Sequence, residues 1–119
     1  DLDTITFAFG SAAIPPSQFD AVTEIGLVLE SILEENPDEL FLIEGHTDAV
    51  GSDYANLLLS DQRAEAVAVM LSSNFDIPPE NLVPQGYGEE FLKVQTEAPE
   101  RENRRVAIRR ITDLVRAGG

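Results

Sequence analysis

Residues 40–67 read LFLIEGHTDAVGSDYANLLLSDQRAEAV, and this stretch predicts a strand, a loop and a helix in turn. Leu40 to Ile43 is continuously apolar, which suits a strand that is buried on both faces. His46 to Asp53 contains Gly51 and predicts a loop. From Tyr54 to about Ser73, apolar side chains return at helical spacing, so we expect a long helix with one buried face.

Another helix is expected before this stretch. Apolar side chains recur at helical spacing from Phe19 onward. Ser17 and Asp20 resemble a capping box at the start of this helix, with Asp in place of the usual Glu or Gln. The helix should end near Asn36, because Pro37 disfavours the helical conformation of the residue before it.

Three more strands complete the expected fold. Alternation of Ile5, Phe7 and Phe9 with smaller side chains indicates a strand within residues 2–9. The order β-α-β-α-β-(short helix)-β predicts an α+β fold, in which two main helices pack on one face of a mixed four-stranded sheet. The remaining segments are a strand at 82–87, a polar connection at 89–103 with one helical turn around Pro99, and a strand at 104–111.

Length and composition limit the classes of function. The 119 residues fit a single domain, with a core at about residues 4–112. The chain begins at Asp1 without the apolar region of a signal peptide, so we expect a fragment of a longer protein. A net charge of −14, from 22 acidic and 8 basic residues, argues against nucleic-acid binding and against a basic membrane-surface mode. No run approaches the roughly 20 apolar residues of a membrane span, and the lack of Cys excludes thiolate chemistry.

The predicted long helix carries a polar stripe on its buried side. Asn56, Ser60 and Arg63 follow one another at i, i+4 and i+7, among the apolar side chains of the helix. A charged side chain on a buried face needs a partner. Asp48 could form a structural ion pair with Arg63, or the two could bind a zwitterion such as an amino-acid head group. In the second case the carboxylate would hold an ammonium and the guanidinium a carboxylate. The residues alone leave both alternatives open.

The same residues resemble the signature of the OmpA-like C-terminal domain. That family pattern is GHTDxxGxxxxNxxLSxxRAxxV, and residues 45–67 match every fixed position. The similarity extends over about residues 4–112, which is nearly the whole chain. The matching residues are Gly45-His46-Thr47-Asp48, Gly51, Asn56, Leu59-Ser60, Arg63-Ala64 and Val67, with further similar segments at Phe7-Ala8-Phe9, Gly86-Tyr87-Gly88-Glu89 and Asn103-Arg104-Arg105-Val106.

The resemblance implies non-covalent binding of peptidoglycan through the diaminopimelate of the stem peptide. Such a domain would lie in the periplasm of a Gram-negative bacterium and anchor an outer-membrane or envelope protein to the cell wall. By position, Asp48 would hold the ammonium group of the ligand and Arg63 its carboxylate. The other residues of the implied site are Asn56, Arg104, Thr47, which would shape the loop, and Gly10.

Two positions depart from the family pattern. Gly10 stands where many members carry Asn or Asp, so one side-chain contact to the ligand is missing and a lower affinity is expected. Ala107 follows the NRRV segment where Glu is common, and this change concerns the sheet surface rather than the site.

Catalysis and metal binding have less support from the residues. His46, Asp48 and Asp53 could hold a metal, but a single His without a second nitrogen or sulfur ligand does not suit zinc. We therefore expect no metal and no cofactor. Glu44 and Asp48 could act as a hydrolase pair, although an Asp beside Arg63 does not suit a general acid. We expect a binding module without enzymatic activity.

Two further alternatives concern protein partners. The domain could be a protein-interaction module whose wall site has decayed, with Asp48 and Arg63 left as a structural bridge. Leu58 and Val69 fall on the outer face of the predicted long helix and indicate a partner or homodimer surface.

Overall fold

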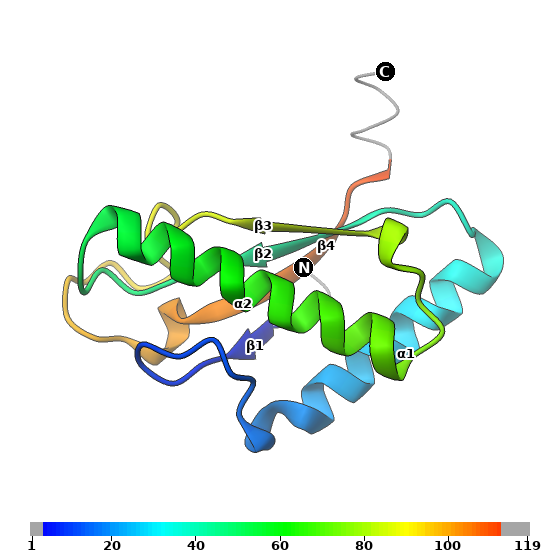
Figure 1. Cartoon of the computed structure of the whole chain (residues 1–119), viewed down its shortest axis with the longest axis horizontal. Coiled ribbons are helices and arrows are strands. Elements are labelled where there is room, and N and C mark those ends of the chain that lie inside the picture. The colour runs from blue at the N-terminus through cyan, green and yellow to red at the C-terminus, as the bar shows by residue number, and fades with distance from the viewer. Residues whose placement is uncertain (1–3, 113–119) are drawn as a thin grey trace.

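Four strands form one mixed sheet in the computed structural model, which describes residues 4–112 (Figure 1). The strands lie in the order β1-β4-β2-β3. β4 is antiparallel to both of its neighbours, β1 and β2, whereas β2 and β3 are parallel. The bounds are Thr4–Thr6 for β1, Phe41–Gly45 for β2, Leu82–Gly86 for β3 and Arg105–Arg110 for β4.

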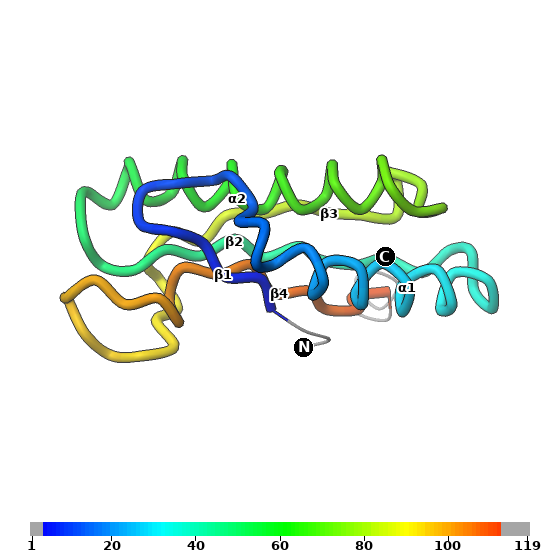
Figure 2. The backbone as a smooth tube through the Cα atoms, turned by 90° about the horizontal axis from the view of Figure 1, so that it is seen from below, coloured from blue at the N-terminus to red at the C-terminus, as the bar shows by residue number. Residues whose placement is uncertain are grey.

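Two helices complete the fold. α1 spans Phe19–Glu35 and α2 spans Asp53–Asn74. α2 lies over β2 and β3, and α1 lies on the β1 side of the molecule (Figures 1 and 2). The structure thus confirms the predicted α+β fold, with two main helices and a mixed four-stranded sheet. Short 3₁₀ turns precede α1, β3 and β4 at Pro16–Gln18, Pro79–Asn81 and Arg101–Asn103.

One apolar core joins both helices to the sheet. Alternate residues of the central strands point toward the helices, among them Phe41, Ile43 and Ile108, which are fully buried. Burial of each such side chain contributes about 1.5–3 kcal/mol, so this packing rather than local propensity holds the helices in place. The helical contributions are Val22, Ile25, Leu29 and Leu33 from α1, and Ala64, Val67 and Leu71 from α2.

The predicted start of α1 is wrong in one respect. Ser17 and Asp20 do not form a capping box, because Gln18 occupies the N-cap position and its side chain makes no capping bond. Instead, the side-chain oxygen of Gln18 accepts a hydrogen bond from the backbone N–H of Thr6 (3.0 Å). The start of α1 is therefore tied to β1 rather than capped locally.

The first strand is shorter than the alternation predicts. β1 ends at Thr6, and the N–H of Ser11 donates to the carbonyl of Ala8 (3.2 Å), so the chain turns where a strand was expected. Phe9 is consequently exposed. Residues 2–3 of the predicted strand lie outside the described residues.

α2 approaches the sheet closely where β2 and β3 end in glycine. A Cβ atom on Gly45 would collide with the carbonyl oxygen of Ser60, and one on Gly86 would collide with the Ser60 hydroxyl. The close approach lets the Ser60 hydroxyl accept from the N–H of Gly88 (2.8 Å), and the carboxylate of Asp61 from the N–H of Gly86 (2.7 Å). The glycines thereby place the first half of α2 against the strand ends.

We expect Gly45→Ala to lower the free energy of unfolding by about 1–3 kcal/mol or more, because the added Cβ must displace the α2 backbone. Thermal denaturation measures this loss. Ser73→Ala, at an exposed position of the same helix, is the matched control and should change stability by less than about 0.5 kcal/mol. An unchanged melting temperature for Gly45→Ala would show that α2 is not held at this distance.

Glu39 is buried at the opposite end of β2. Its carboxylate accepts hydrogen bonds from the Arg110 guanidinium (2.8 Å), the Thr112 hydroxyl and the Asn36 side chain (2.9 Å). The Arg110 bond is the largest of the causes that lower the pKa of Glu39 to about 2, and burial opposes them. The folded-state pKa lies below the ordinary value of 4.5, so ionised Glu39 stabilises the fold above about pH 4.5. This stability is lost as the pH falls toward 2.

Glu39→Gln should therefore flatten the acid limb of the stability profile. The variant is expected to be less stable than the wild type near neutral pH, and to lose less stability between pH 4.5 and about 2. Urea denaturation at a series of pH values measures both effects. Parallel profiles for the two proteins would mean that Glu39 does not titrate as the structure indicates.

Candidate functional site

Asp48 lies in the loop after β2 and is 3% exposed. One carboxylate oxygen accepts from the Arg104 guanidinium (3.1 Å) and from the backbone N–H of Glu100 (3.2 Å). The other oxygen accepts from the N–H of Val50 (3.3 Å). The carboxylate is therefore held between its own loop and the segment that enters β4, with Arg104 as its ion-pair partner.

Arg63 lies on α2 and is fully buried. Its guanidinium donates to three backbone carbonyls, those of Ser11 (2.8 Å), His46 (3.0 Å) and Ala8 (3.1 Å). The ring of Phe7 lies 5.3 Å from the guanidinium carbon, within the range of a cation–π contact. One side chain thus joins α2 to the end of β2 and to the loop that follows β1.

Asp48 and Arg63 interact through space without a direct ion pair. Among residues 4–112, Arg104 is the ion-pair partner of Asp48, so the structural Asp48–Arg63 ion pair, one of the two alternatives that the sequence left open, does not form. Burial lowers the pKa of Arg63 to about 10, while nearby Asp48 opposes this shift and Arg104 adds to it. Arg63 therefore stays protonated near neutral pH, and its direct partners are carbonyl oxygens rather than a counter-ion.

Asn56 closes the loop that carries Asp48. It is buried, like Ser60 and Arg63, which confirms the predicted polar stripe on the inner side of α2. Its side-chain amide donates to the Val50 carbonyl (3.0 Å) and to the Glu89 carboxylate (3.0 Å). The contact with Glu89 was not foreseen from the sequence, because nothing in the helical spacing of α2 points to a residue after β3.

Thr47 and Gly10 lie beside these groups for different reasons. The N–H of Thr47 donates to the Gly88 carbonyl (2.9 Å), whereas its buried hydroxyl oxygen has no hydrogen-bond partner among residues 4–112. Gly10 has φ +69°, a left-handed conformation that Gly, Asn and Asp adopt most readily. An added Cβ there would meet no atom within 4 Å, so the loop leaves open space at this position.

The arrangement retains capacity for further polar bonds. Three bonds to Asp48 and three from Arg63 leave roughly one lone-pair site on the carboxylate and two N–H groups on the guanidinium. A ligand with an ammonium and a carboxylate a few ångströms apart would donate to the free site on the Asp48 carboxylate and accept from the free N–H groups of Arg63.

The residues considered for a metal site or for hydrolysis are not brought together in one site. His46 contacts Glu44 (3.3 Å) and stacks on Tyr87, with ring centroids 5.7 Å apart. Glu44 also pairs with Arg109, so it and Asp48 have different ion-pair partners. No group of three or more His, Asp or Glu side chains within residues 4–112 is placed to hold a metal ion.

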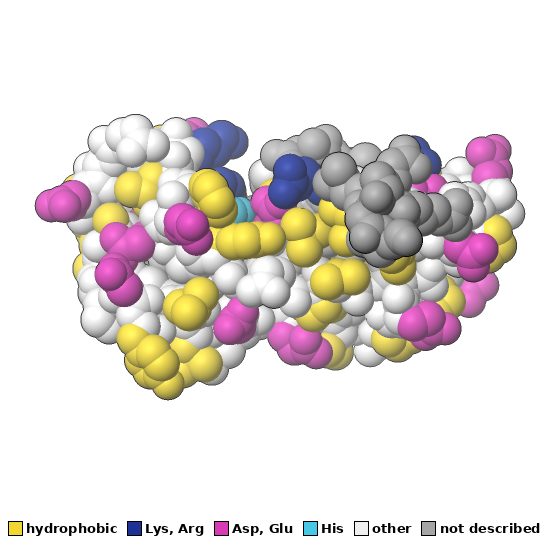
Figure 3. Space-filling model, turned by 90° about the horizontal axis from the view of Figure 1, so that it is seen from above, with side chains coloured by type: hydrophobic (Ala, Val, Ile, Leu, Met, Phe, Trp, Pro, Cys, Tyr) yellow, Lys and Arg dark blue, Asp and Glu magenta, His cyan; other side chains and the backbone are white. Residues whose placement is uncertain are grey.

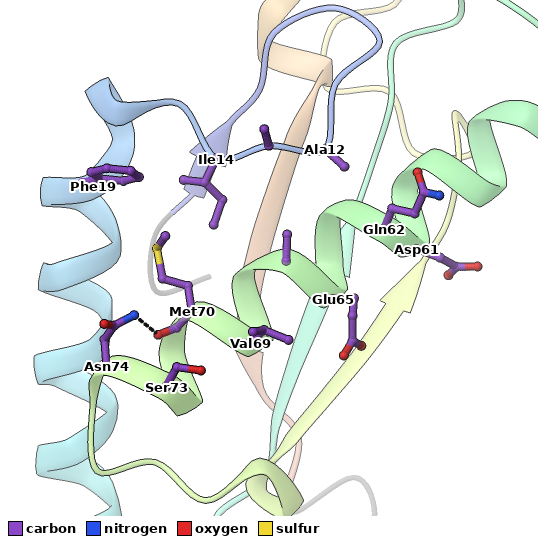
Figure 4. A pocket seen from close by; sticks show the side chains of 12 residues that line it. Ala12, Ile14, Phe19, Asp61, Gln62, Glu65, Val69, Met70, Ser73 and Asn74 are labelled. Carbon is purple, nitrogen blue, oxygen red and sulfur yellow. Dashed lines mark hydrogen bonds between the residues drawn. The ribbon is translucent and has the colours of Figure 1, made fainter.

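A hollow of about 890 Å³ lies between α2 and the chain from Ala12 to Phe19 (Figure 4). Its apolar lining includes Ile14 from the segment before α1, Phe19 from the start of α1 and Met70 from α2. Val69 borders this hollow, and Val69 and Leu58 are about half exposed. Their predicted exposure is confirmed, and the homodimer expected from it stays a prediction.

Comparison with known proteins identifies the class to which the chain belongs. The sequence profile of the OmpA family matches residues 6–106, so the chain is a member of the OmpA family. The probable lipoprotein YiaD of Escherichia coli K12 is 30% identical over 108 residues, covering 89% of this chain and 47% of YiaD. Outer membrane porin F of Pseudomonas fluorescens is 30% identical over 104 residues, covering 86% of this chain and 30% of the porin. The chain spans less than half the length of either relative.

Solved structures show the same fold. The peptidoglycan-associated lipoprotein from Burkholderia pseudomallei superposes with a TM-score of 0.76 at 27% identity, covering 90% of this chain and 88% of that one. The C-terminal domain of Helicobacter pylori MotB also gives a TM-score of 0.76, at 22% identity, covering 99% of this chain and 91% of that one. At that identity the MotB likeness concerns the fold alone. Within residues 4–112, neither helix combines the length and the apolar character needed to cross a membrane.

Proposed function

We propose that this domain binds peptidoglycan non-covalently and holds a longer outer-membrane or envelope protein to the cell wall from the periplasm. Membership of the OmpA family supports this proposal, as do relatives that are an outer membrane porin and a probable lipoprotein. The Burkholderia protein of the same fold is described as peptidoglycan-associated. The domain would act by reversible docking, without a cofactor and without catalysis.

The ligand group in this proposal is the free amino-acid end of diaminopimelate in the stem peptide. Asp48 receives its ammonium group, and Arg63 donates to its carboxylate. Asn56 and Arg104 contribute further polar contacts, and the unpartnered hydroxyl of Thr47 lies in the same loop as Asp48. Gly10 provides space but no side-chain contact.

The observation that carries the proposal is that Arg63 is charged and buried without a directly bonded counter-ion. Its protonated guanidinium has no exposed surface, and its direct acceptors among residues 4–112 are all carbonyl oxygens. The nearby Asp48 is paired with another arginine. A buried charge without a counter-ion is costly, and a ligand carboxylate would supply that counter-ion.

Binding requires a local opening in the unliganded structure. Arg63 is fully covered and Asp48 is 3% exposed. The segments bonded to them are the loop from Ala8 to Ser11 and the segment around Glu100. We expect one of these two segments to shift when the ligand enters.

Co-sedimentation with purified sacculi tests the proposed function. The domain should pellet with sacculi whose stem peptides contain diaminopimelate, pellet much less with sacculi that contain lysine instead, and release no soluble muropeptides. Release of muropeptides would indicate a hydrolase. A folded domain that stays in the supernatant would indicate a decayed wall site. Equal pelleting with both wall types would contradict recognition of diaminopimelate.

A further inference from the structure

The face of the sheet that points away from α2 carries a basic hollow. Alternation along the strands places Glu44 of β2, and Arg105 and Arg109 of β4, on this face, because the intervening residues point into the core. With His46, Tyr87 and Phe91, these side chains line a hollow of about 320 Å³. Figure 3 shows a groove near the middle of the molecule in which a His side chain lies between Lys or Arg side chains.

Aromatic rings line one side of this hollow. His46 stacks on Tyr87, and Phe91 meets both rings edge-on, with centroid distances of 5.5 Å to Tyr87 and 6.3 Å to His46. Phe91 is 53% exposed although it packs against these two rings. This side of the hollow therefore offers a rigid apolar surface next to charged groups.

Arg105 brings an uncompensated charge to the hollow. Its guanidinium donates to the Phe91 carbonyl (3.1 Å) and to the Asn103 carbonyl (3.5 Å), and no carboxylate of residues 4–112 lies within ion-pair distance of it. Burial lowers the pKa of Arg105, and Glu44 opposes this shift only through space. The chain has 22 acidic residues, yet within the described part of it this arginine has no carboxylate partner.

A neighbouring hollow of about 270 Å³ shares Arg105. It is also lined by Lys93 and Arg101, with Glu102 as its acidic residue. The two hollows together gather four of the chain's 8 basic residues. Each is near the lower limit of about 300 Å³ for a ligand pocket, so each is large enough for a single acidic side chain or a small anion.

We propose that these two hollows form a docking surface for an acidic, extended polypeptide segment of a protein partner. One of its carboxylates would pair with Arg105, and a second would share the half-exposed guanidinium of Arg109 with Glu44. An apolar side chain between them, on the same side of the extended segment, would pack on the exposed ring of Phe91. Arg105 and Arg109 are four residues apart on β4, or about 13 Å, and acidic residues two to four positions apart on an extended segment span about 7–13 Å. The surface shares no side chain with the proposed wall site around Asp48 and Arg63, so either assignment can fail without the other.

An NMR titration of the domain tests this surface. The probes are the acetylated and amidated peptide EAFAE, in which both Glu and the Phe lie on one side of the extended chain, its neutral counterpart QAFAQ, and sodium acetate. The acidic peptide should shift the side-chain N–H signals of Arg105 and Arg109 and the ring signals of Phe91, and it should bind at least about tenfold more tightly than the neutral peptide. High salt should weaken binding of the acidic peptide, because salt screens the attraction between its carboxylates and the arginines.

Charge-removing variants complete the test. Arg105→Gln combined with Arg109→Gln should reduce affinity for EAFAE by about tenfold or more. Arg110→Gln, on the opposite side of the same strand, removes an equal charge and should leave the affinity unchanged. If the double variant unfolds, Arg109→Gln alone carries the comparison, because Arg109 is half exposed.

Four results would overturn the proposal. Equal binding of QAFAQ would show that the surface does not recognise charge, and unchanged affinity in the variants would place the peptide elsewhere. Acetate shifts equal to those of EAFAE would reduce the surface to a simple anion site. Soluble cell-wall fragments that displace EAFAE would identify the cell wall, rather than a protein, as the ligand of this surface.

Discussion

Asp48→Asn is expected to abolish wall binding. The substitution keeps the size of the side chain but removes the charge that, in our account, holds the ligand ammonium. Loss of one partner from a buried charge pair costs about 2–5 kcal/mol, which corresponds to an affinity loss of at least about 30-fold. Co-sedimentation with sacculi and calorimetry with a stem peptide would both measure it.

The same variant should also be less stable. Asp48 pairs with Arg104 and supports the charge of Arg63, so its neutralisation leaves two guanidinium groups less well compensated. We expect a loss of about 3 kcal/mol in unfolding free energy. Asp53→Asn, at an exposed position in the first turn of α2, is the matched control and should retain wall binding. Wild-type pelleting of a folded Asp48→Asn variant would remove Asp48 from the site.

Arg63→Lys is expected to lower stability about as much as Asp48→Asn. The guanidinium reaches the carbonyls of Ala8, Ser11 and His46 from one buried position. A lysine ammonium is a compact charge on a flexible side chain and cannot donate to all three of these carbonyls in the same way. With one or two carbonyls left unpaired, at about 1–3 kcal/mol each, the free energy of unfolding should fall by about 3 kcal/mol. Urea denaturation would measure the loss.

Wall binding by Arg63→Lys should be lost even under conditions where the variant is folded, because an ammonium cannot donate two parallel bonds to a carboxylate. Arg101→Lys is the control, since Arg101 is exposed and makes no contact with Asp48 or Arg63. Near-wild-type stability together with retained binding would mean that only the positive charge matters at position 63.

The fold and the inner face of α2 could be predicted because periodicity reports burial directly. The helical spacing of Asn56, Ser60 and Arg63 placed three polar side chains on the core side, and all three are buried. The continuous apolar run before Gly45 similarly predicted a central strand.

The pairing within the site could not be predicted in the same way. Arg104 follows Asp48 by 56 residues, and the two meet only because β4 lies next to β2 in the sheet. Two of the three carbonyl partners of Arg63 come from a turn at Ala8–Ser11 that replaces part of the predicted strand. Any residue can supply a backbone carbonyl, so the residue types in the sequence do not indicate which carbonyls will accept from Arg63.

The basic surface of β4 shows a related limit. Alternation places Arg105 and Arg109 on one face, but whether a carboxylate neutralises each of them depends on which side chains of the neighbouring strand β2 lie beside them. The structure shows that Glu44 pairs with Arg109 while Arg105 bonds to carbonyls, a distinction that spacing alone does not contain.

Calorimetric titration of the domain with meso-diaminopimelate, and with a stem peptide that contains it, would show whether Asp48 and Arg63 bind the ligand, with lysine as the control. We expect binding of both diaminopimelate ligands and none of lysine, because lysine lacks the second amino-acid head that Asp48 and Arg63 would hold. No heat with any ligand, from a sample shown to be folded, would indicate that Asp48 and Arg63 serve the structure alone.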